Sequence, residues 1–484
     1  MAMPALEGLE DTICAVATPV GEGGIGIVRI SGRESLAIAE QVVRLRSGQP
    51  LSSTSSHTLH HADFIFPAAS ICDSSTIDSP TNVTHELLDE GLVVFMQAPR
   101  SFTAEDVVEL QCHGSGLILA RLCEACLAAG ARLAQPGEFT KRAFLNGRLD
   151  LSQAEAVLDT IKARSDQGLK IAQRHLRGEL GREVDRLRLR LLTTLAHVEA
   201  GIDFVEEDIS FVERKELLGV LEDTCDSIDQ MLSTAECGRL LREGARVVIV
   251  GRPNVGKSSL LNRLLREDRA IVTPIPGTTR DLIEESVAWD GLIITLVDTA
   301  GIRHTDDVVE TEGIRRTRLA QAEADLVIHV LDGQLLAHGG PDGGQLDEAH
   351  AGIVVVNKID LLDSMQAQCA LSSARRLSSE EIVPVSTITG HGIDRLKFRI
   401  RSHLFRGGRE SGPGITIANV RHRTALQQAR HALQQAWEAS QQGLQPELIA
   451  VDIRASAEAL GQITGAITSD EVLDRIFSEF CIGK

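Results

Sequence analysis

The chain has 484 residues, which is too long for one hydrophobic core and predicts about three domains. A net charge of −19, no Tyr and only 2 Trp exclude a uniformly basic surface and an aromatic base-stacking platform for nucleic acid. The sequence contains no run of 18 apolar residues, so we expect no membrane span. The acidic start lacks the pattern of a signal peptide, and 9 irregularly spaced cysteines indicate free thiols. We therefore expect a cytoplasmic protein.

The first 146 residues mix short strand-like runs with polar turns. Strands are predicted at residues 25–30, 91–96 and 107–110. Residues 46–84 are rich in Ser, Thr and His, and we interpret them as a long surface loop or a variable insert.

From about residue 147 the pattern becomes helical. One apolar stripe predicts a single long helix, and it consists of Leu176, Leu180, Val184, Leu187, Leu191 and Leu195. Helical patterns continue through Leu217, Leu221, Ile228 and Met231 to about residue 243.

Six arginines on this helix allow two interpretations: Arg174, Arg177, Arg182, Arg186, Arg188 and Arg190. They could form a patch that contacts phosphates. The favoured interpretation is a solvated face paired with Glu179, Glu183 and Asp185 at helical spacing.

Continuous apolar runs at 247–250, 293–297, 326–331 and 353–356 are separated by helix-length spacers. This pattern predicts a parallel sheet covered on both faces. A glycine-rich linker at 407–414 precedes a second helical segment. We expect a G domain (244–407) inserted into a helical domain (147–243 and 408–484). Two independent helical segments are the alternative.

The strongest motif is Gly251-Arg-Pro-Asn-Val-Gly256-Lys257-Ser258, between a predicted strand and a predicted helix. Its backbone amides would cradle phosphates, Lys257 would contact the β and γ oxygens, and the Ser258 hydroxyl would bind Mg²⁺. The motif therefore predicts a phosphate loop.

Three further motifs complete a Ras-type nucleotide site. In Asp298-Thr-Ala-Gly301, the Asp would hold Mg²⁺ through water and the Gly N–H would contact the γ-phosphate. Thr279 would be the switch threonine that binds the metal. In Asn357-Lys-Ile-Asp360, the Asp carboxylate would accept two hydrogen bonds that guanine offers and adenine does not. Ser386-Thr387 stands where such enzymes usually carry Ser-Ala. The chain is therefore predicted to bind and hydrolyse GTP.

One position departs from the Ras pattern. Ile302 follows the Asp-x-x-Gly motif, where Ras-like enzymes carry a Gln that orients water. Either hydrolysis is very slow or another group orients the water.

From end to end the chain resembles the MnmE/TrmE tRNA-modification GTPases. The matching stretches beside the G motifs are 11–32, 101–114, 136–155 and the final Phe-Cys-Ile-Gly-Lys at 480–484. Two features depart from the family pattern, namely His113-Gly-Ser-Gly and the 46–84 segment. The resemblance implies a multidomain α/β protein: an α+β folate-binding-like domain at 1–146 that also dimerises, a discontinuous helical domain, and the inserted Ras-like G domain.

By this resemblance, four residues match the family's tetrahydrofolate site: Arg29, Glu109, Arg148 and Lys484. The ligand would be the 5,10-methylene or 5-formyl form. Taken singly, each would be read as a surface charge or ion pair. Cys481 has either a thiol role or a structural one, and Cys123 and Cys126 are interpreted as core packing and not as a zinc site.

The resemblance also implies K⁺-dependent hydrolysis, with K⁺ bound by Asn254, Thr273, Ile275 and Thr278, and Glu310 as the catalytic carboxylate. Without it, Asn254 would be a polar loop residue and Glu310 an exposed charge. The GTP site would comprise Asn254, Val255, Gly256, Lys257, Ser258, Ser259, Thr273, Pro274, Ile275, Pro276, Gly277, Thr278, Thr279, Asp298, Thr299, Ala300, Gly301, Asn357, Lys358, Ile359, Asp360, Ser386 and Thr387.

Finally, the resemblance implies a homodimer that acts with a separate FAD-dependent, MnmG-like protein on the C5 atom of the wobble uridine in certain tRNAs. The alternative is a ribosome-assembly GTPase that acts as a binding switch. The G motifs fit both, while the first 150 residues and the final tetrapeptide favour tRNA modification. A signalling switch is disfavoured, because no lipidation motif and no catalytic Gln are present.

Overall fold

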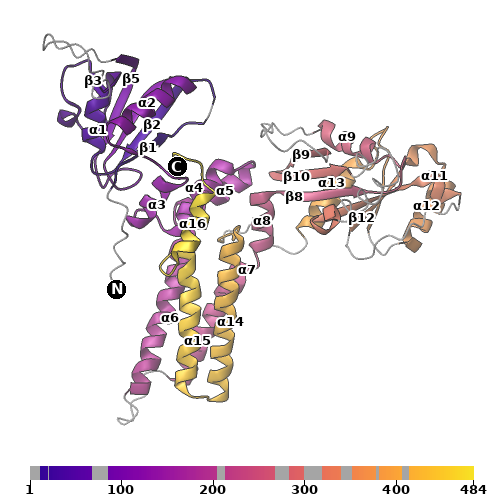
Figure 1. The fold of residues 1–484 in the computed structure, drawn as a ribbon. Helices are drawn as coiled ribbons and strands as arrows, with labels where there is room; N and C mark the ends of the chain where they lie inside the picture. Colours follow the sequence, from indigo (N-terminus) through magenta and orange to yellow (C-terminus); the bar gives the residue numbers. More distant parts are fainter. Residues whose placement is uncertain are drawn as a thin grey trace, which may run out of the picture. The chain divides into compact units, whose positions relative to one another are not determined.

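The computed structural model describes residues 11–19, 21–67, 86–203, 213–267, 283–298, 319–338, 352–377, 381–405 and 414–484. Its contacts divide the chain into two compact units, and Figure 1 shows their elements. The first unit comprises residues 1–158 and 464–484, and the second comprises residues 159–463.

A seven-stranded sheet forms the centre of the first unit, in the order β3-β4-β5-β6-β2-β1-β7. Its neighbours are antiparallel except for the parallel pair β1 and β7. The predicted strands at 25–30, 91–96 and 107–110 are confirmed as parts of longer strands. The seven strands are β1 (Ile13–Val16), β2 (Gly23–Ser31), β3 (Val43–Leu45), β4 (Leu59–Phe66), β5 (Glu86–Met96), β6 (Val107–Gly114) and β7 (Arg132–Leu133).

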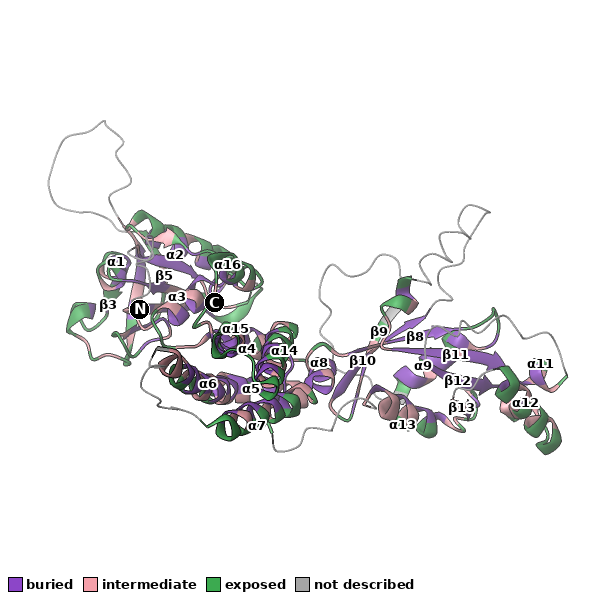
Figure 2. Ribbon diagram, turned by 90° about the horizontal axis from the view of Figure 1, so that it is seen from below, coloured by how far each residue is buried: buried purple, intermediate pink, exposed green. Residues whose placement is uncertain are grey.

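Helices α1 (Ser35–Val42) and α2 (Gly116–Ala128) pack on this sheet and close one hydrophobic core. Figure 2 shows the buried strands beneath these helices. Cys123 and Cys126 belong to this core, with exposed fractions of 8% and 0%. The prediction that they serve packing is therefore confirmed.

The predicted loop at 46–84 is wrong in part. Residues 51–53 form a 3-10 turn and residues 59–66 form strand β4. Ala62 and Phe64 point into the core at period-two spacing, whereas the Ser, Thr and His residues before them give the segment a polar composition. Residues 68–85 lie outside the described part of the chain.

Helices α3 (Glu138–Leu145), α4 (Leu151–Lys162) and α16 (Asp470–Ser478) build a second, smaller core in the first unit. It contains Phe144, Leu151, Leu158, Leu473, Phe477 and Phe480. Residues near the carboxyl end of the chain therefore complete a unit that begins at its amino end.

A six-stranded sheet lies in the second unit, in the order β13-β12-β11-β8-β10-β9. Every predicted strand is present, and neighbouring strands from β13 to β10 are parallel. Strand β9 pairs antiparallel with β10, so the expectation of an all-parallel sheet is wrong at this edge. The strands are β8 (Ala245–Val250), β9 (Ile283–Trp289), β10 (Leu292–Asp298), β11 (Leu326–Asp332), β12 (Gly352–Asn357) and β13 (Glu381–Pro384).

Helices flank this sheet, as in a Ras-like domain. They are α9 (Lys257–Glu267), α11 (Gly333–Ala337), α12 (Ser364–Leu377) and α13 (Ile393–Leu404), and a short 3-10 turn covers Ile359–Leu361. The fold class predicted from the sequence is confirmed.

The remaining helices of the second unit bury one long apolar cluster, which includes Leu187, Leu221 and Leu433. The single helix predicted through Leu176 is wrong, because α5 ends at Leu176 and α6 begins at Glu179. Gly178, at a φ of +75°, separates the two. The helices are α5 (Asp166–Leu176), α6 (Glu179–Asp203), α7 (Arg214–Leu232), α8 (Ala235–Glu243), α14 (Val420–Gln442) and α15 (Pro446–Thr464).

Among the described residues, no helix is both long and apolar enough to cross a membrane.

Candidate functional site

The phosphate loop connects β8 to α9, as the motif predicts. Gly256 has a φ of +100°, and a Cβ atom there would lie 2.2 Å from the side-chain amide nitrogen of Asn357. Only glycine fits this position without moving the base-binding loop.

Lys257 points back across the loop that precedes it. Its Nζ donates hydrogen bonds to the backbone carbonyls of Gly251 and Arg252, both at 2.9 Å. The side chain is buried, with 7% of the residue exposed. The ammonium group therefore lies within the curve of the loop, where loops of this type hold phosphate oxygens.

Ser258 and Asp298 form the candidate magnesium site. The Ser258 hydroxyl donates to Asp298 Oδ2 at 2.7 Å, and Asp298 is 2% exposed at the carboxyl end of β10. Hydroxyl and carboxylate oxygens are the donors that Mg²⁺ prefers. The structure thus brings together two residues that stand 40 positions apart in the sequence.

Asn357 links the base-binding loops to the phosphate loop. Its Nδ2 donates to the backbone carbonyl of Val255 at 2.9 Å, and its Oδ1 accepts from the backbone N–H of Thr387 at 3.3 Å. Ser386 is fully buried, and its hydroxyl accepts from the N–H of Thr389 at 3.1 Å. Asp360 is exposed, and its predicted contact with the base stays a prediction.

Asp332 is a residue of this site that sequence reasoning missed. It ends β11, is 6% exposed, and accepts from Lys358 Nζ at 2.6 Å. The same Lys358 Nζ donates to the backbone carbonyl of Asn254 at 2.8 Å. An acidic residue directly after a predicted strand was the available signal.

Part of the predicted GTP site lies outside the described residues. This part comprises Thr273, Pro274, Ile275, Pro276, Gly277, Thr278, Thr279, Thr299, Ala300 and Gly301, together with Ile302 and Glu310. Their roles stay predictions.

In the first unit, Arg29 and Glu109 are cross-strand neighbours on β2 and β6. Arg29 Nε donates to Glu109 Oε1 at 2.9 Å, and the two side chains are 15% and 16% exposed. The Arg29 guanidinium also lies 5.5 Å from the ring centre of Phe102 and 5.6 Å from that of Phe139. Aromatic faces and a carboxylate therefore hold this cation in place.

Arg148 contacts the same aromatic ring. Its guanidinium is 5.2 Å from the Phe102 ring centre, and its Nη1 donates to the Phe102 carbonyl at 2.7 Å. Phe102 thus contacts two of the four predicted folate residues. An open hollow of about 590 Å³ adjoins it.

Lys484 ends a segment that folds onto the first unit. The Lys484 N–H donates to the carbonyl of Cys481 at 3.3 Å, and Gly483 packs against the backbone of Val16. Strand β1, which contains Val16, pairs with β2, which contains Arg29. All four predicted folate residues therefore belong to one unit.

A buried ionic network supports this region. Arg142 has no exposed surface and donates to the carboxylates of Asp11, at 2.7 Å, and Glu138, at 3.1 Å. Hydrogen bonds from Arg132 and Arg142 lower the pKa of Asp11. Burial alone would raise the pKa of Glu138, but hydrogen bonds from Arg132, the Gln135 N–H and Arg142 outweigh it and lower that pKa.

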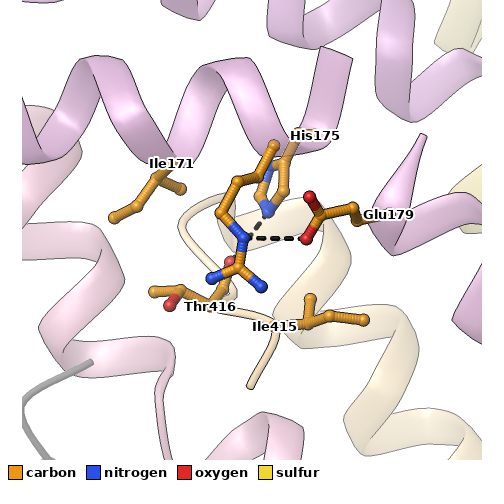
Figure 3. A pocket seen from close by; sticks show the side chains of 6 residues that line it. Ile171, His175, Glu179, Ile415 and Thr416 are labelled. Carbon is orange, nitrogen blue, oxygen red and sulfur yellow. Dashed lines mark hydrogen bonds and ion pairs between the residues drawn. The ribbon is translucent and has the colours of Figure 1, made fainter. Parts of the chain in front are cut away.

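The arginines of α5 and α6 contact neighbouring groups. Arg174 pairs with Glu179 at 2.7 Å, Arg186 with Glu183 at 2.6 Å and Arg190 with Asp223 at 2.8 Å. Figure 3 shows the side chains that line a small space here, among them Glu179, Ile415 and His175. The space measures about 10 Å³, which has room for no more than one water molecule. The favoured interpretation, pairing at helical spacing, is confirmed for Arg186, whereas Arg174 pairs with a residue of the next helix and Arg190 with a residue of α7.

Eight cysteines lie in the described residues, and all are free. Cys481 is exposed, while Cys14 and Cys123 are buried with their sulfurs 3.9 Å apart. No group of three or more His, Cys, Asp or Glu side chains suited to a metal ion occurs in the described part. The role of the Cys481 thiol stays a prediction.

Comparison with known proteins covers nearly the whole chain. The "GTP-binding protein TrmE N-terminus" family matches residues 12–148, and the "MnmE helical domain" family matches residues 151–481. Among solved structures, Era from Aquifex aeolicus aligns with a TM-score of 0.27, too low to support an argument. It is 28% identical and covers 39% of this chain and 66% of its own.

Curated relatives align along their full length. "tRNA modification GTPase MnmE" from Symbiobacterium thermophilum is 46% identical over 480 residues, which are 98% of this chain and 100% of the relative. The protein of that name from Moorella thermoacetica is 46% identical over 481 residues, again 98% and 100% of the two chains. That from Bacillus subtilis is 42% identical over 478 residues, with the same coverage. On this basis the chain belongs to the MnmE/TrmE family of tRNA modification GTPases.

Proposed function

We propose that this chain is a K⁺-dependent GTPase that modifies C5 of the wobble uridine in certain tRNAs. It would use a one-carbon unit from tetrahydrofolate and act with an FAD-dependent, MnmG-like partner. One observation carries the proposal: a single chain combines an assembled nucleotide site with the Arg29–Glu109 pair and the folded tail at Lys484. A stand-alone GTP switch needs only the first of these.

The nucleotide site fits Mg²⁺ and is consistent with K⁺. Ser258 and Asp298 offer a hydroxyl and a carboxylate 2.7 Å apart, a donor set suited to Mg²⁺. Asn254 has an exposed side chain in the phosphate loop and offers a neutral amide oxygen, as a weakly hydrated monovalent cation requires. When bound, both ions add positive charge near the phosphate oxygens and stabilise negative charge in the transition state.

The residues of the chain perform the remaining tasks. Lys257 contacts the transferred phosphate, and Asp360 selects guanine through its exposed carboxylate. Asn357 and Lys358 hold the phosphate loop against the base-binding loop, so both ends of the nucleotide are positioned together. Glu310 would position the water that Ile302 cannot.

The residues of the first unit fit a folate. Folates carry a flat pterin with hydrogen-bond donors and an anionic glutamate. Glu109 is a partly exposed carboxylate that can accept from the pterin, and Arg29, Arg148 and Lys484 can pair with carboxylates. The folate would supply a one-carbon unit, and this chain would bind and orient it. We further propose a cytoplasmic homodimer.

Nucleoside analysis of tRNA tests the proposal. A strain that lacks this gene should contain unmodified uridine at the wobble position, and a plasmid copy should restore aminomethyl or carboxymethylaminomethyl uridine. A Glu310→Gln copy should bind GTP normally, hydrolyse it roughly 100-fold more slowly and fail to restore the modification. Its fold is checked by unchanged GTP affinity.

The same strain tests the alternative. If its tRNA is fully modified while ribosomal subunits accumulate as incomplete particles, the chain is a ribosome-assembly GTPase and the proposal is wrong. Normal modification with the Glu310→Gln copy would show that hydrolysis is not required.

A further inference from the structure

The proposed function assigns Arg148 to the folate but leaves the rest of the hollow beside Phe102 without a role. Its volume is about 590 Å³, within the range of small-molecule sites. Its lining is His57, Met96, Pro99, Arg100, Ser101, Phe102, Ala104, Asn146, Gly147 and Arg148. This lining contains two arginines and one histidine, and no carboxylate. Its charge therefore favours an anionic ligand.

The two arginines are available to a ligand. Both side chains are exposed, and neither forms an ion pair with any residue that the structure describes. Arg148 is held by the Phe102 ring and carbonyl, which leaves other guanidinium donors for a carboxylate.

Two acidic residues close in sequence to Phe102 are already hydrogen-bonded. Asp106 Oδ1 accepts from the backbone N–H of Ala98 at 2.8 Å. Glu105 accepts from Ser31 at 2.7 Å and from Arg142 at 3.3 Å. These carboxylates do not line the hollow, so its positive charge is not neutralised at its walls.

Phe102 joins the hollow to the Arg29–Glu109 pair. Its ring lies 5.5 Å from the Arg29 guanidinium and 5.2 Å from that of Arg148, so the two cations share one aromatic side chain. Phe102 is thus the side chain that the pair and the hollow have in common. A ligand that spans both would be flat and neutral where it meets Glu109 and anionic where it meets Arg148 and Arg100.

We propose that the hollow binds the γ-linked oligoglutamate tail of the folate, so that this protein prefers polyglutamylated folates to the monoglutamate. This inference rests on the proposed function of the first unit and names the form of its ligand. Each added glutamate contributes one carboxylate, and Arg100 and His57 line the hollow together with Arg148 and can pair with the added carboxylates.

Isothermal titration of the full-length protein with two probes tests the proposal. The probes are 5-formyltetrahydrofolate with one glutamate and with three. The triglutamate should bind at least about 5-fold more tightly at about 0.05 M salt, and this ratio should shrink at about 0.5 M salt, because the paired charges are partly exposed.

Arg100→Gln should bring the ratio close to one while the melting temperature stays that of the wild type. The matched control is Arg44→Gln, which removes an exposed arginine from the edge strand β3 of the same unit and should keep the ratio. A wild-type ratio of one, with both probes bound, would overturn the tail site but leave the folate site intact. Failure of both probes to bind would instead refute the folate site itself.

Binding of tRNA is measured with the same variants, because RNA phosphates are the other anionic groups that the hollow could bind. If Arg100→Gln weakens tRNA binding and leaves the folate ratio unchanged, the hollow binds RNA phosphates and the proposal is wrong.

Discussion

Lys358 connects the two halves of the nucleotide site, because its Nζ lies 2.8 Å from the carbonyl oxygen of Asn254 and 2.6 Å from the carboxylate of Asp332. The backbone of Lys358 has a φ of +64°, so the residue departs from the preceding strand and turns its side chain toward the phosphate loop. A buried carboxylate thus anchors the lysine that holds the loop.

Asp332→Asn should weaken GTP and GDP binding by roughly 10-fold, because a charged anchor costs about 1.5 kcal/mol when it becomes neutral. Turnover at saturating GTP should change little, since the Asp332 carboxylate acts on the loop through Lys358. Titration with a fluorescent guanine nucleotide measures the loss. Asp290→Asn is the control, since that carboxylate is 77% exposed in a surface pair with Arg401. Wild-type affinity in Asp332→Asn would show that the anchor is dispensable.

GTP turnover should be faster in K⁺ than in Na⁺, and Asn254→Ala should remove the difference. The physical reason is the amide oxygen that Asn254 offers beside the phosphates, together with Ile302 in place of a water-orienting residue. Phosphate release in matched KCl and NaCl checks this prediction. Asn262→Ala, an exposed asparagine on α9, should keep the K⁺ effect. Equal wild-type rates in the two salts would remove K⁺ from the proposed function.

Asp360→Asn should lower GTP affinity by roughly 100-fold, because guanine then leaves donors unpaired at a cost of about 3 kcal/mol. The variant should bind xanthosine triphosphate, whose C2 carbonyl accepts from the new amide. Competition between the two nucleotides provides the measurement. Asp363→Asn, three positions further on, should keep the preference for GTP. If Asp360→Asn also prefers GTP, another residue reads the base.

The first unit should lose stability in acid through Glu138. The folded-state pKa of Glu138 lies below its ordinary value of 4.5. The ionised carboxylate therefore adds to the free energy of unfolding above pH 4.5, and this contribution is lost as the pH falls through the folded-state pKa. Glu138→Gln should cost about 1–3 kcal/mol near pH 6 and much less near pH 3.5.

Hydrogen exchange of α3 measures this loss. Both Trp residues, Trp289 and Trp437, lie in the other unit, so fluorescence would not report on the first unit. At each pH the variant is compared with the wild type, so that the pH dependence of the intrinsic exchange rate cancels. Glu90→Gln, from an exposed pair with Arg46, is the control. An equal destabilisation by Glu138→Gln at both pH values would contradict the linkage.

The G domain could be predicted well because its motifs are local. Residues 251–258 fit one loop between a strand and a helix, and the apolar runs that became β8, β10, β11 and β12 are continuous. Strand β9 was missed because its sequence, Ile-Glu-Glu-Ser-Val-Ala-Trp, is half polar, as an edge strand can be. Strand β4 was missed for a similar reason, since it begins with Leu-His-His and carries Asp63 between the buried Ala62 and Phe64.

Contacts between distant residues could not be read from the sequence. Asp332 holds Lys358 from 26 positions away, and Phe102 contacts Arg148 from 46 positions away. Neither distance follows a helix or strand period, so only tertiary structure reveals these pairs. At Gly178 a regular sequence pattern misleads. The apolar stripe continues across this residue, but the backbone there is not helical.

The return of residues 464–484 to the first unit has a consequence for biosynthesis. Gly483, at a φ of +92°, lies so close to Val16 that a Cβ would stand 2.1 Å from the Val16 carbonyl oxygen. This contact cannot form until the ribosome has translated the roughly 300 residues between the two parts of the unit. At about 5–20 residues per second, the wait is about 15–60 seconds. Until then the apolar side chains of Phe144, Leu151 and Leu158 lack the cover that Phe477 and Phe480 later provide.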